Sequence, residues 1–375
     1  MSRPSWAPVV GGLIGAVLLV FVAFGAVVPV LPPLVLERGG SDLSVGLAFA
    51  GSGIAALLFR PYAGQLAQRY GGRRVMVAGC VLAALVGLAY AVPAGVPGLL
   101  VTRLAMGLAE SMVFTAGSVW VVALAPDDRR AEIVGYYGLA MWSGWTVGPL
   151  LGQVLGASWA VWAVATAGPL LAIGVLLALP RPEVLGGPVS RVLLPRSVIL
   201  PGTALALAAF GYAALTGFVA LHLEARGIAH GAVLLSVFGA AYVGVRVVAG
   251  RVPDRVGAAP VVLACALGEA IGLLLITVAP TLWVAIGGAL VMGGSFTLLY
   301  PALALVVIDR APERERGAAL GAFTSFWDAG LGVSGLVTGV IALAGYPWVF
   351  AVATGLAALS AGVGLRALRT PAPVR

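Results

Sequence analysis

Two carboxyl groups lie deep inside long apolar stretches of this chain, where an ionisable side chain is costly. Glu110 lies about twelve residues into the stretch 98–123, and Asp328 lies about as deep in the stretch 317–341. Twelve residues of α-helix rise about 18 Å, which reaches the middle of a lipid bilayer. A charged aspartate there costs about 2.5–3.5 kcal/mol, so such groups are functional candidates by default. We interpret both as proton-binding carboxyls. The alternative is that hydrogen bonds hold them and they only fix helix packing.

Arg103 lies seven residues before Glu110, so both side chains leave one face of a predicted helix. The axial separation of about 10 Å is too long for a direct pair, but a cation on that face favours the ionised carboxyl. Aromatic residues at membrane depth could contact a solute, with ordinary packing as an equal alternative. These candidates are Phe24, Trp142, Trp145, Tyr300 and Trp327.

The composition places these residues in a membrane. Hydrophobic residues make up 61% of the chain and charged residues 10%, whereas a soluble domain has about 25% charged residues. The net charge of +8 does not indicate nucleic-acid binding, because the arginines lie in short loops between apolar runs. The lipid bilayer is therefore an expected partner, and nucleic acid is not.

Several classes of chemistry have no matching residues. The chain has no lysine, so it has no phosphate-binding loop of the type Gly-x-x-x-x-Gly-Lys, and ATP is not the expected energy source. Cys80 and Cys265 each lie in an apolar run without a cysteine or histidine at ligand spacing, and we expect two buried thiols. We expect no metal, no cofactor and no enzymatic activity.

Twelve apolar stretches are long enough to span a bilayer, which takes about 20 apolar residues each. They predict an all-α membrane protein with an N-terminal bundle of six helices (1–180), a linker (181–197) and a C-terminal bundle of six (198–375). The predicted spans are 9–36, 43–66, 74–92, 98–123, 132–156, 158–179, 198–222, 230–251, 259–279, 283–307, 317–341 and 346–367.

The loop arginines predict the orientation of these spans. Arg38 and Arg226 fall on one side of the membrane, and nearly all the other loop arginines fall on the opposite side. Because positive loops stay inside, we expect both termini and the linker in the cytoplasm of a bacterium, with the spans in its inner membrane.

An internal repeat with an offset of 186 residues relates the two halves. It superimposes two loops with the pattern Arg-x-x-x-Gly-x-x-x-(Gln/Asp)-Arg-x-Gly, which predicts a duplicated membrane domain with a parallel repeat. The first loop holds Arg60, Gly64, Gln68, Arg69 and Gly71, and the second holds Arg246, Gly250, Asp254, Arg255 and Gly257.

Three motifs resemble those of the major facilitator superfamily, and the resemblance spans the whole chain. The segment from Arg60 to Arg74, which includes Arg73, looks like its loop signature between helices 2 and 3. The segment from Arg103 to Gly107 with Glu110 looks like its helix-4 signature. A helix-5 signature associated with antiporters and exporters is matched by Gly144, Gly148, Pro149 and Gly152. Within this superfamily, the sequence resembles the bacterial arabinose-efflux-type and drug:proton antiporter permeases of twelve helices.

The resemblance implies a secondary transporter with alternating access. Helices 1, 4, 7 and 10 would line a central cavity, and helices 3, 6, 9 and 12 would face lipid. The expected function is export of a small organic solute, drug-like or sugar-like, in exchange for protons, by a monomer. The alternative is a symporter or facilitator that imports a sugar, an organic acid or another metabolite. A membrane enzyme or receptor is disfavoured because each loop is too short to house a domain.

Further expectations concern single positions. Gln68 stands where the family usually has Asp, so we expect a weaker latch against the helix that starts near Gly317. The glycine stripe of helix 5 is expected to contact helix 8. Arg60 and Arg246 are expected near cytoplasmic helix ends, where arginine can reach water.

For three further ionisable residues, a role outside transport is expected. Glu269 is expected to pair with Arg246, with proton coupling as the alternative. His222 and His230 are expected in exposed loops, with a pH sensor as the alternative.

Overall fold

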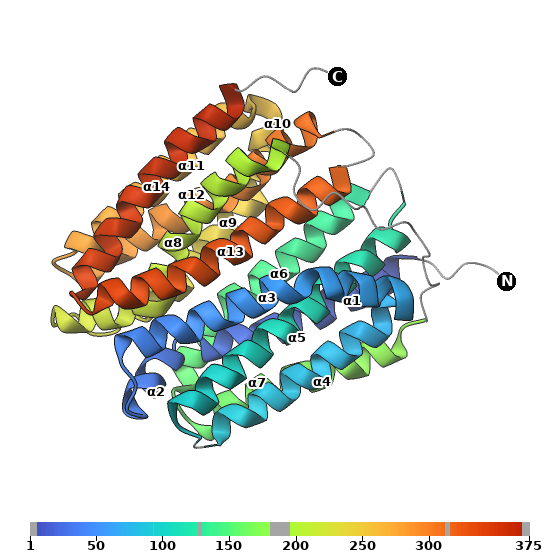
Figure 1. Cartoon of the computed structure of the whole chain (residues 1–375), viewed down its shortest axis with the longest axis horizontal. Helices are drawn as coiled ribbons and strands as arrows, with labels where there is room; N and C mark the ends of the chain where they lie inside the picture. The colour runs from blue at the N-terminus through green and yellow to red at the C-terminus, as the bar shows by residue number, and fades with distance from the viewer. Residues whose placement is uncertain (1–5, 93, 127–129, 181–195, 312–315, 370–375) are drawn as a thin grey trace. The chain divides into compact units, whose positions relative to one another are not determined.

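The described residues fold into long helices joined by short turns (Figure 1). This computed structural model describes residues 6–92, 94–126, 130–180, 196–311 and 316–369. The all-α prediction is confirmed. The helices are α1 (Trp6–Val27), α2 (Leu31–Glu37), α3 (Asp42–Tyr70), α4 (Gly72–Ala91), α5 (Gly95–Leu124), α6 (Arg130–Leu155), α7 (Trp159–Ala178), α8 (Arg196–Ala225), α9 (Val233–Ala249), α10 (Val252–Val256), α11 (Ala258–Val278), α12 (Leu282–Arg310), α13 (Arg316–Ala342) and α14 (Tyr346–Arg369).

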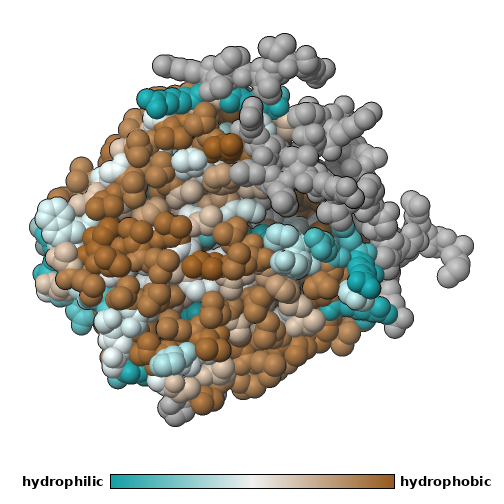
Figure 2. Space-filling model, in the orientation of Figure 1, coloured by the Kyte–Doolittle hydropathy of each residue, from teal (hydrophilic) through white to brown (hydrophobic). Residues whose placement is uncertain are grey.

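Among the described residues, 10 helices are long and apolar enough to cross a membrane. The helices α6 and α9 occupy the remaining two predicted spans. Large apolar side chains are exposed on these helices, among them Leu85 on α4 and Ile271 on α11. Figure 2 shows a face covered mostly by hydrophobic residues. This is the surface of a protein that passes through the membrane several times.

The first predicted span is divided in two. Helix α1 ends at Val27, and α2 begins at Leu31 with a proline in its first turn. Proline lacks the N–H group that a continuous helix needs, but fits the first turn of a new one. The prolines therefore divide this predicted span into two helices.

The chain divides into two compact units. Unit 1 contains Met1–Gly40 and Gly51–Val189, and unit 2 contains Ser41–Ala50 and Ser190–Arg375. In unit 1, α1 packs against α6 and α7, and α4 packs against α5 and α7. In unit 2, α8 packs against α13 and α14, while α11 packs against α12 and α14.

Equivalent turns of the repeat share a backbone conformation that requires glycine. Gly71 precedes α4 with φ of 90°, and Gly257 precedes α11 with φ of 85°. A side chain at such angles clashes with the backbone, whereas glycine adopts them without strain. The glycines of the repeated loop motif therefore set the entry into one helix of each unit.

Arginine side chains bind the free carbonyl groups at helix C-termini. Arg73 donates to the Leu179 carbonyl at 3.0 Å and to the Leu177 carbonyl at 2.6 Å, at the end of α7. Arg38 binds the end of α4 in the same way, and Arg226 binds the end of α11. These cations satisfy carbonyls that have no partner within their helix and complement the helix dipole.

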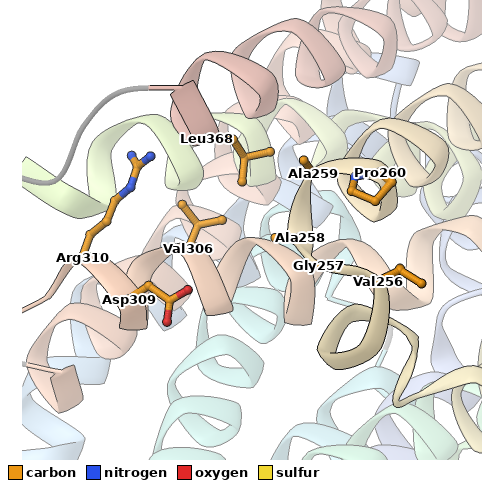
Figure 3. Close-up of a pocket in the computed structure, with 9 residues that line it drawn as sticks. All are labelled: Val256, Gly257, Ala258, Ala259, Pro260, Val306, Asp309, Arg310 and Leu368. Atoms are coloured by element: carbon orange, nitrogen blue, oxygen red, sulfur yellow. The ribbon is translucent and has the colours of Figure 1, made fainter.

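Unit 2 has no arginine at the position that repeats Arg73, which is Ala259. A pocket of about 440 Å³ lies there, lined by Ala259 at the start of α11, Val306 and Asp309 on α12, and Leu368 on α14 (Figure 3). The repeat is therefore asymmetric at this end of α11.

Candidate functional site

Helices α3 and α5 of unit 1 lie in direct backbone contact, which positions the charged residues of the site. A Cβ atom at Gly107 would collide with the Ser52 carbonyl oxygen, so only glycine permits this approach. Arg103, with 2% exposure, donates to Ser52 Oγ and to Met106 Sδ, both at 2.8 Å. Arg103 therefore links the two helices near the start of the site.

Further along the same two helices, Arg60 faces Glu110. Arg60 Nη2 lies 4.0 Å from Glu110 Oε1, with side-chain exposures of 13% and 18%. This distance exceeds that of a hydrogen bond, so the two groups form an electrostatic pair. The expected position of Arg60 near a helix end is wrong, because α3 continues to Tyr70 and places Arg60 well inside the unit.

Aromatic rings surround this pair. The Arg60 guanidinium lies 5.7 Å from the centre of the Phe114 ring, within the range of a cation–π interaction. Phe114 in turn stacks on Tyr137 at 5.3 Å, and the Tyr137 hydroxyl donates to the Phe114 carbonyl at 3.1 Å. Neither ring was among our candidates, although Phe114 lies four residues after Glu110, and this spacing places both on one helix face.

Three of the predicted solute contacts, Phe24, Trp142 and Trp145, lie in unit 1. Phe21 of α1 meets Phe24 at 5.8 Å and Trp145 at 5.9 Å, both edge to face. Phe24 is buried, and Trp142 and Trp145 are half-buried. The contact of Phe21 with Trp145 joins α1 to α6, and Trp142 and Trp145 keep part of their surface accessible.

The glycine stripe of α6 packs against α1. A Cβ atom at Gly148 would lie 2.6 Å from Gly25 Cα, and one at Gly25 would lie 3.0 Å from Pro149 Cδ. Gly144 meets Phe21, and Gly152 meets the Ala26 carbonyl. Within unit 1 the stripe is thus covered by α1, whereas the sequence analysis expected a contact with the eighth predicted span.

In unit 2, Asp328 of α13 is 2% exposed and follows a tryptophan that joins a ring cluster. Trp327 meets Tyr212 of α8 at 5.5 Å and Phe296 of α12 at 5.6 Å. Phe238 and Tyr242 of α9 extend the cluster. Five rings from four helices therefore form a cluster, and a buried carboxyl group directly follows one of them in the chain.

Tyr300 makes its own contacts between α12 and α13. Its hydroxyl is 2.8 Å from Thr324 Oγ1, and its ring meets Phe323 at 5.1 Å. Tyr300 thus joins α12 to α13 and keeps 36% of its surface exposed.

The repeat is visible in the packing of unit 2. A Cβ atom at Gly293 would collide with the Phe238 carbonyl, as Gly107 does with Ser52, and Arg246 Nη1 lies 3.5 Å from the Thr297 carbonyl. Phe296 occupies the position that repeats Glu110. Equivalent arginines thus meet a carboxylate in unit 1 and a backbone carbonyl in unit 2.

Two expectations about unit 2 are wrong. Glu269 does not bind Arg246, since neither of its oxygens has a hydrogen-bond partner among the described residues. His222 is fully buried, with Nε2 3.3 Å from the Ile276 carbonyl, because α8 continues to Ala225. His230 is exposed in the turn that follows, as expected.

The repeated loops hold the other candidates. Arg69 and Arg255 are exposed, and the Arg69 guanidinium lies 5.2 Å from the Tyr70 ring centre. Gly64 lies opposite Thr115, and Gly250 ends α9. Gln68 is half-buried. The side chain of Asp254 and the surroundings of Gly317 lie outside the described residues, so the latch stays a prediction.

The described residues contain no group of three or more histidines, cysteines, aspartates or glutamates that could hold a metal ion. The chemistry available in unit 1 is proton binding at a carboxyl beside a guanidinium. In unit 2 it is ring stacking beside a second carboxyl.

Comparison with known proteins agrees with this architecture. The family model described as Major Facilitator Superfamily matches residues 13–232 and 201–375. The chain belongs to the major facilitator superfamily. It is 33% identical over 359 residues to the uncharacterized MFS-type transporter YhhS of Escherichia coli (strain K12), covering 91% of this chain and 87% of the relative. It is 32% identical over 367 residues to the uncharacterized MFS-type transporter STM4428 of Salmonella typhimurium (strain LT2), covering 93% of each.

Solved structures share the fold at low sequence identity. A D-xylose-proton symporter has a TM-score of 0.79 at 16% identity, and covers 98% of each chain. The human organic anion transporter MFSD10 has a TM-score of 0.73 at 19% identity, covering 96% of this chain and 100% of that one. These structures show the fold alone. The family and the bacterial relatives make the chain a membrane transporter, and neither relative shows its substrate.

Proposed function

We propose that this transporter exports a small organic solute from the bacterial cytoplasm in exchange for protons. It would act as a monomer of the inner membrane with both termini inside, and it would catalyse no covalent chemistry. The observation that carries the proposal is the pair formed by Arg60 and Glu110, 4.0 Å apart and largely buried.

A proton and the Arg60 guanidinium compete for the same carboxylate. At 4.0 Å the attraction between unit charges is about 4 kcal/mol for an effective dielectric constant of about 20. Protonation of Glu110 removes this attraction and releases Arg60 toward Phe114. The charge state of one carboxyl group therefore controls the position of one cation.

This competition suits antiport. A solute with a cationic or hydrogen-bond-donating group can take the place of the proton at the ionised Glu110. Proton binding and solute binding then exclude each other, which is the condition for exchange. The resemblance of the α6 motif to that of exporters supports the outward direction of solute movement.

Unit 2, taken by itself, offers rings that suit the apolar part of a solute. Trp327 and Tyr212 are the half-buried members of the ring cluster, and Asp328 lies next to Trp327 in the chain. An offset or edge-to-face ring contact contributes about 0.5–1.5 kcal/mol beyond the area that it buries. We therefore expect a solute with a flat or ring-shaped apolar part.

The proposal is tested with proteoliposomes that carry an imposed pH gradient of either sign. Antiport predicts that candidate solutes leave the compartment that protons enter, and that Glu110→Gln abolishes this dependence. Movement of solute and protons in one direction would establish a symporter. Solute movement that ignores the gradient would establish a facilitator.

A further inference from the structure

Unit 2 contains a buried carboxyl group that the proposed mechanism does not use. Glu269 lies near the middle of α11 (Ala258–Val278), and its exposed fraction is 0%. Both carboxyl oxygens lack a hydrogen-bond partner among the described residues. A group of this kind is rare in folded proteins and calls for an explanation.

Three helices enclose this carboxyl group tightly. Gly211 of α8 lies against Glu269 Oε1, so closely that a Cβ atom there would collide with the oxygen. The same Cβ would lie 2.9 Å from Leu273 Cδ1 of α11 and 3.3 Å from Met292 Cε of α12. The groups around the carboxyl are thus a glycine backbone, a leucine and a methionine.

The close packing continues along α11 and α12. A Cβ atom at Gly272 would lie 2.6 Å from the Gly288 carbonyl oxygen, and one at Gly288 would lie 2.7 Å from the Gly272 carbonyl oxygen. The two backbones therefore touch one turn from Glu269. Little space remains in which the side chain could turn away from Gly211.

Among the described residues, the titratable groups identified near Glu269 carry no positive charge that could hold a carboxylate. On its own helix Cys265 lies one turn earlier and is buried as a free thiol. On α8 Tyr212 directly follows Gly211, with its ring in the aromatic cluster, and His222 lies 11 residues beyond Gly211, with Nε2 at the Ile276 carbonyl. On α12 Met292 approaches the same position as the carboxyl group, and Ser295 lies against the neighbouring Gly268. Ser360 of α14 donates to the Ala204 carbonyl of α8.

The charge state of Glu269 follows from these surroundings. An ionised carboxylate without hydrogen bonds in an apolar site is far more costly than the neutral acid, so such a group takes up a proton. We propose that Glu269 is a proton-binding site of unit 2, separate from Glu110, and that Gly211 leaves the space which the protonated carboxyl occupies. This inference does not depend on antiport, because it concerns the folded protein at rest.

Infrared difference spectroscopy of the purified full chain in lipid nanodiscs tests the proposal. Between about pH 6 and pH 8, the spectrum of wild type minus Glu269→Gln should contain the C=O band of a protonated carboxylic acid, which shifts in D₂O. The control Asp309→Asn changes an exposed carboxyl of α12, and its difference spectrum should instead contain carboxylate bands. Carboxylate bands in the Glu269 difference spectrum would overturn the proposal, whether or not these bands shift with added sodium ions.

A second variant keeps the test decisive if Glu269→Gln does not fold. Gly211→Ala should shift the acid C=O band, because the added methyl group displaces the carboxyl. The matched change Gly287→Ala adds a methyl group of α12 into open space and should leave the band unchanged. An acid band that is absent from wild type, or that stays the same in Gly211→Ala, contradicts the proposal.

Discussion

The Arg60 guanidinium of α3 lies 4.0 Å from the Glu110 carboxylate of α5 and 5.7 Å from the centre of the Phe114 ring. The Arg60 cation can therefore interact with two groups on a single helix face. Only one of them, the carboxylate, can be neutralised by a proton. A proton on Glu110 leaves the ring as the better acceptor. This relationship gives the proposed transport cycle a protonation-dependent movement inside one unit.

Replacing Glu110 with glutamine should abolish the dependence of transport on the pH gradient. The amide has nearly the same shape but cannot exchange a proton, so solute exchange down its own gradient should remain. Flux in proteoliposomes with and without the pH gradient measures both. A variant that retains gradient-driven flux would remove Glu110 from the coupling step.

Replacing Arg60 with glutamine should change the pH dependence of transport, because Glu110 loses its cation. Removal of a positive charge disfavours the ionised carboxyl, so half-maximal coupling should move to higher pH. The repeat supplies the control: Arg246→Gln removes the equivalent arginine, which lies at the Thr297 carbonyl. Equal shifts in both variants would argue against a specific role of the Arg60–Glu110 pair.

Replacing Gly148 with leucine should destabilise unit 1 and block transport. The side chain would drive α6 away from Gly25 of α1, and overpacking of this kind costs about 1–3 kcal/mol or more. The control Gly138→Leu lies on the same helix with open space at its Cβ position. Thermal denaturation in detergent gives the unfolding midpoint of each variant. Equal midpoints would show that the α1–α6 contact accommodates a larger side chain.

Replacing Trp327 with alanine should weaken solute binding about tenfold, which corresponds to about 1.4 kcal/mol, if its ring contacts the solute. Trp348 offers a control, since 62% of its surface is exposed on α14. Binding of the exported solute to each purified variant gives the comparison. Wild-type affinity in Trp327→Ala would assign the ring cluster to packing alone.

Asp328→Asn should reduce gradient-driven flux if this carboxyl also carries protons. The amide keeps the volume of the side chain, so amounts of folded protein should stay at the wild-type level. Normal flux in this variant, combined with loss of coupling in Glu110→Gln, would place coupling in unit 1 alone.

The sequence predicted the helices, the repeat and the glycine stripe, because each depends on local composition or spacing. Gly144 and Gly148 were identified as a close-contact surface, and the structure supplies α1 as the helix that covers it. The covering helix could not be predicted, since helices that are apolar all round have no periodic pattern to show which face is buried.

Errors in helix ends explain the misplaced charged residues. Helix α3 ends at Tyr70 and α8 at Ala225, several residues beyond the predicted spans. These extensions bury Arg60 and His222, which the sequence placed near water. The sequence carried no signal that Glu269 would lack a hydrogen-bond partner, because its packing depends on Gly211, 58 residues earlier in the chain.

The central claim is that solute and proton compete for Glu110. Its most direct test measures proton release when cationic dyes, antibiotics and sugars are added in turn to purified protein in weakly buffered solution. The account predicts that a transported solute releases protons from wild type and from Asp309→Asn, and releases none from Glu110→Gln. Solute binding to wild type without proton release, or equal release from Glu110→Gln, would contradict it.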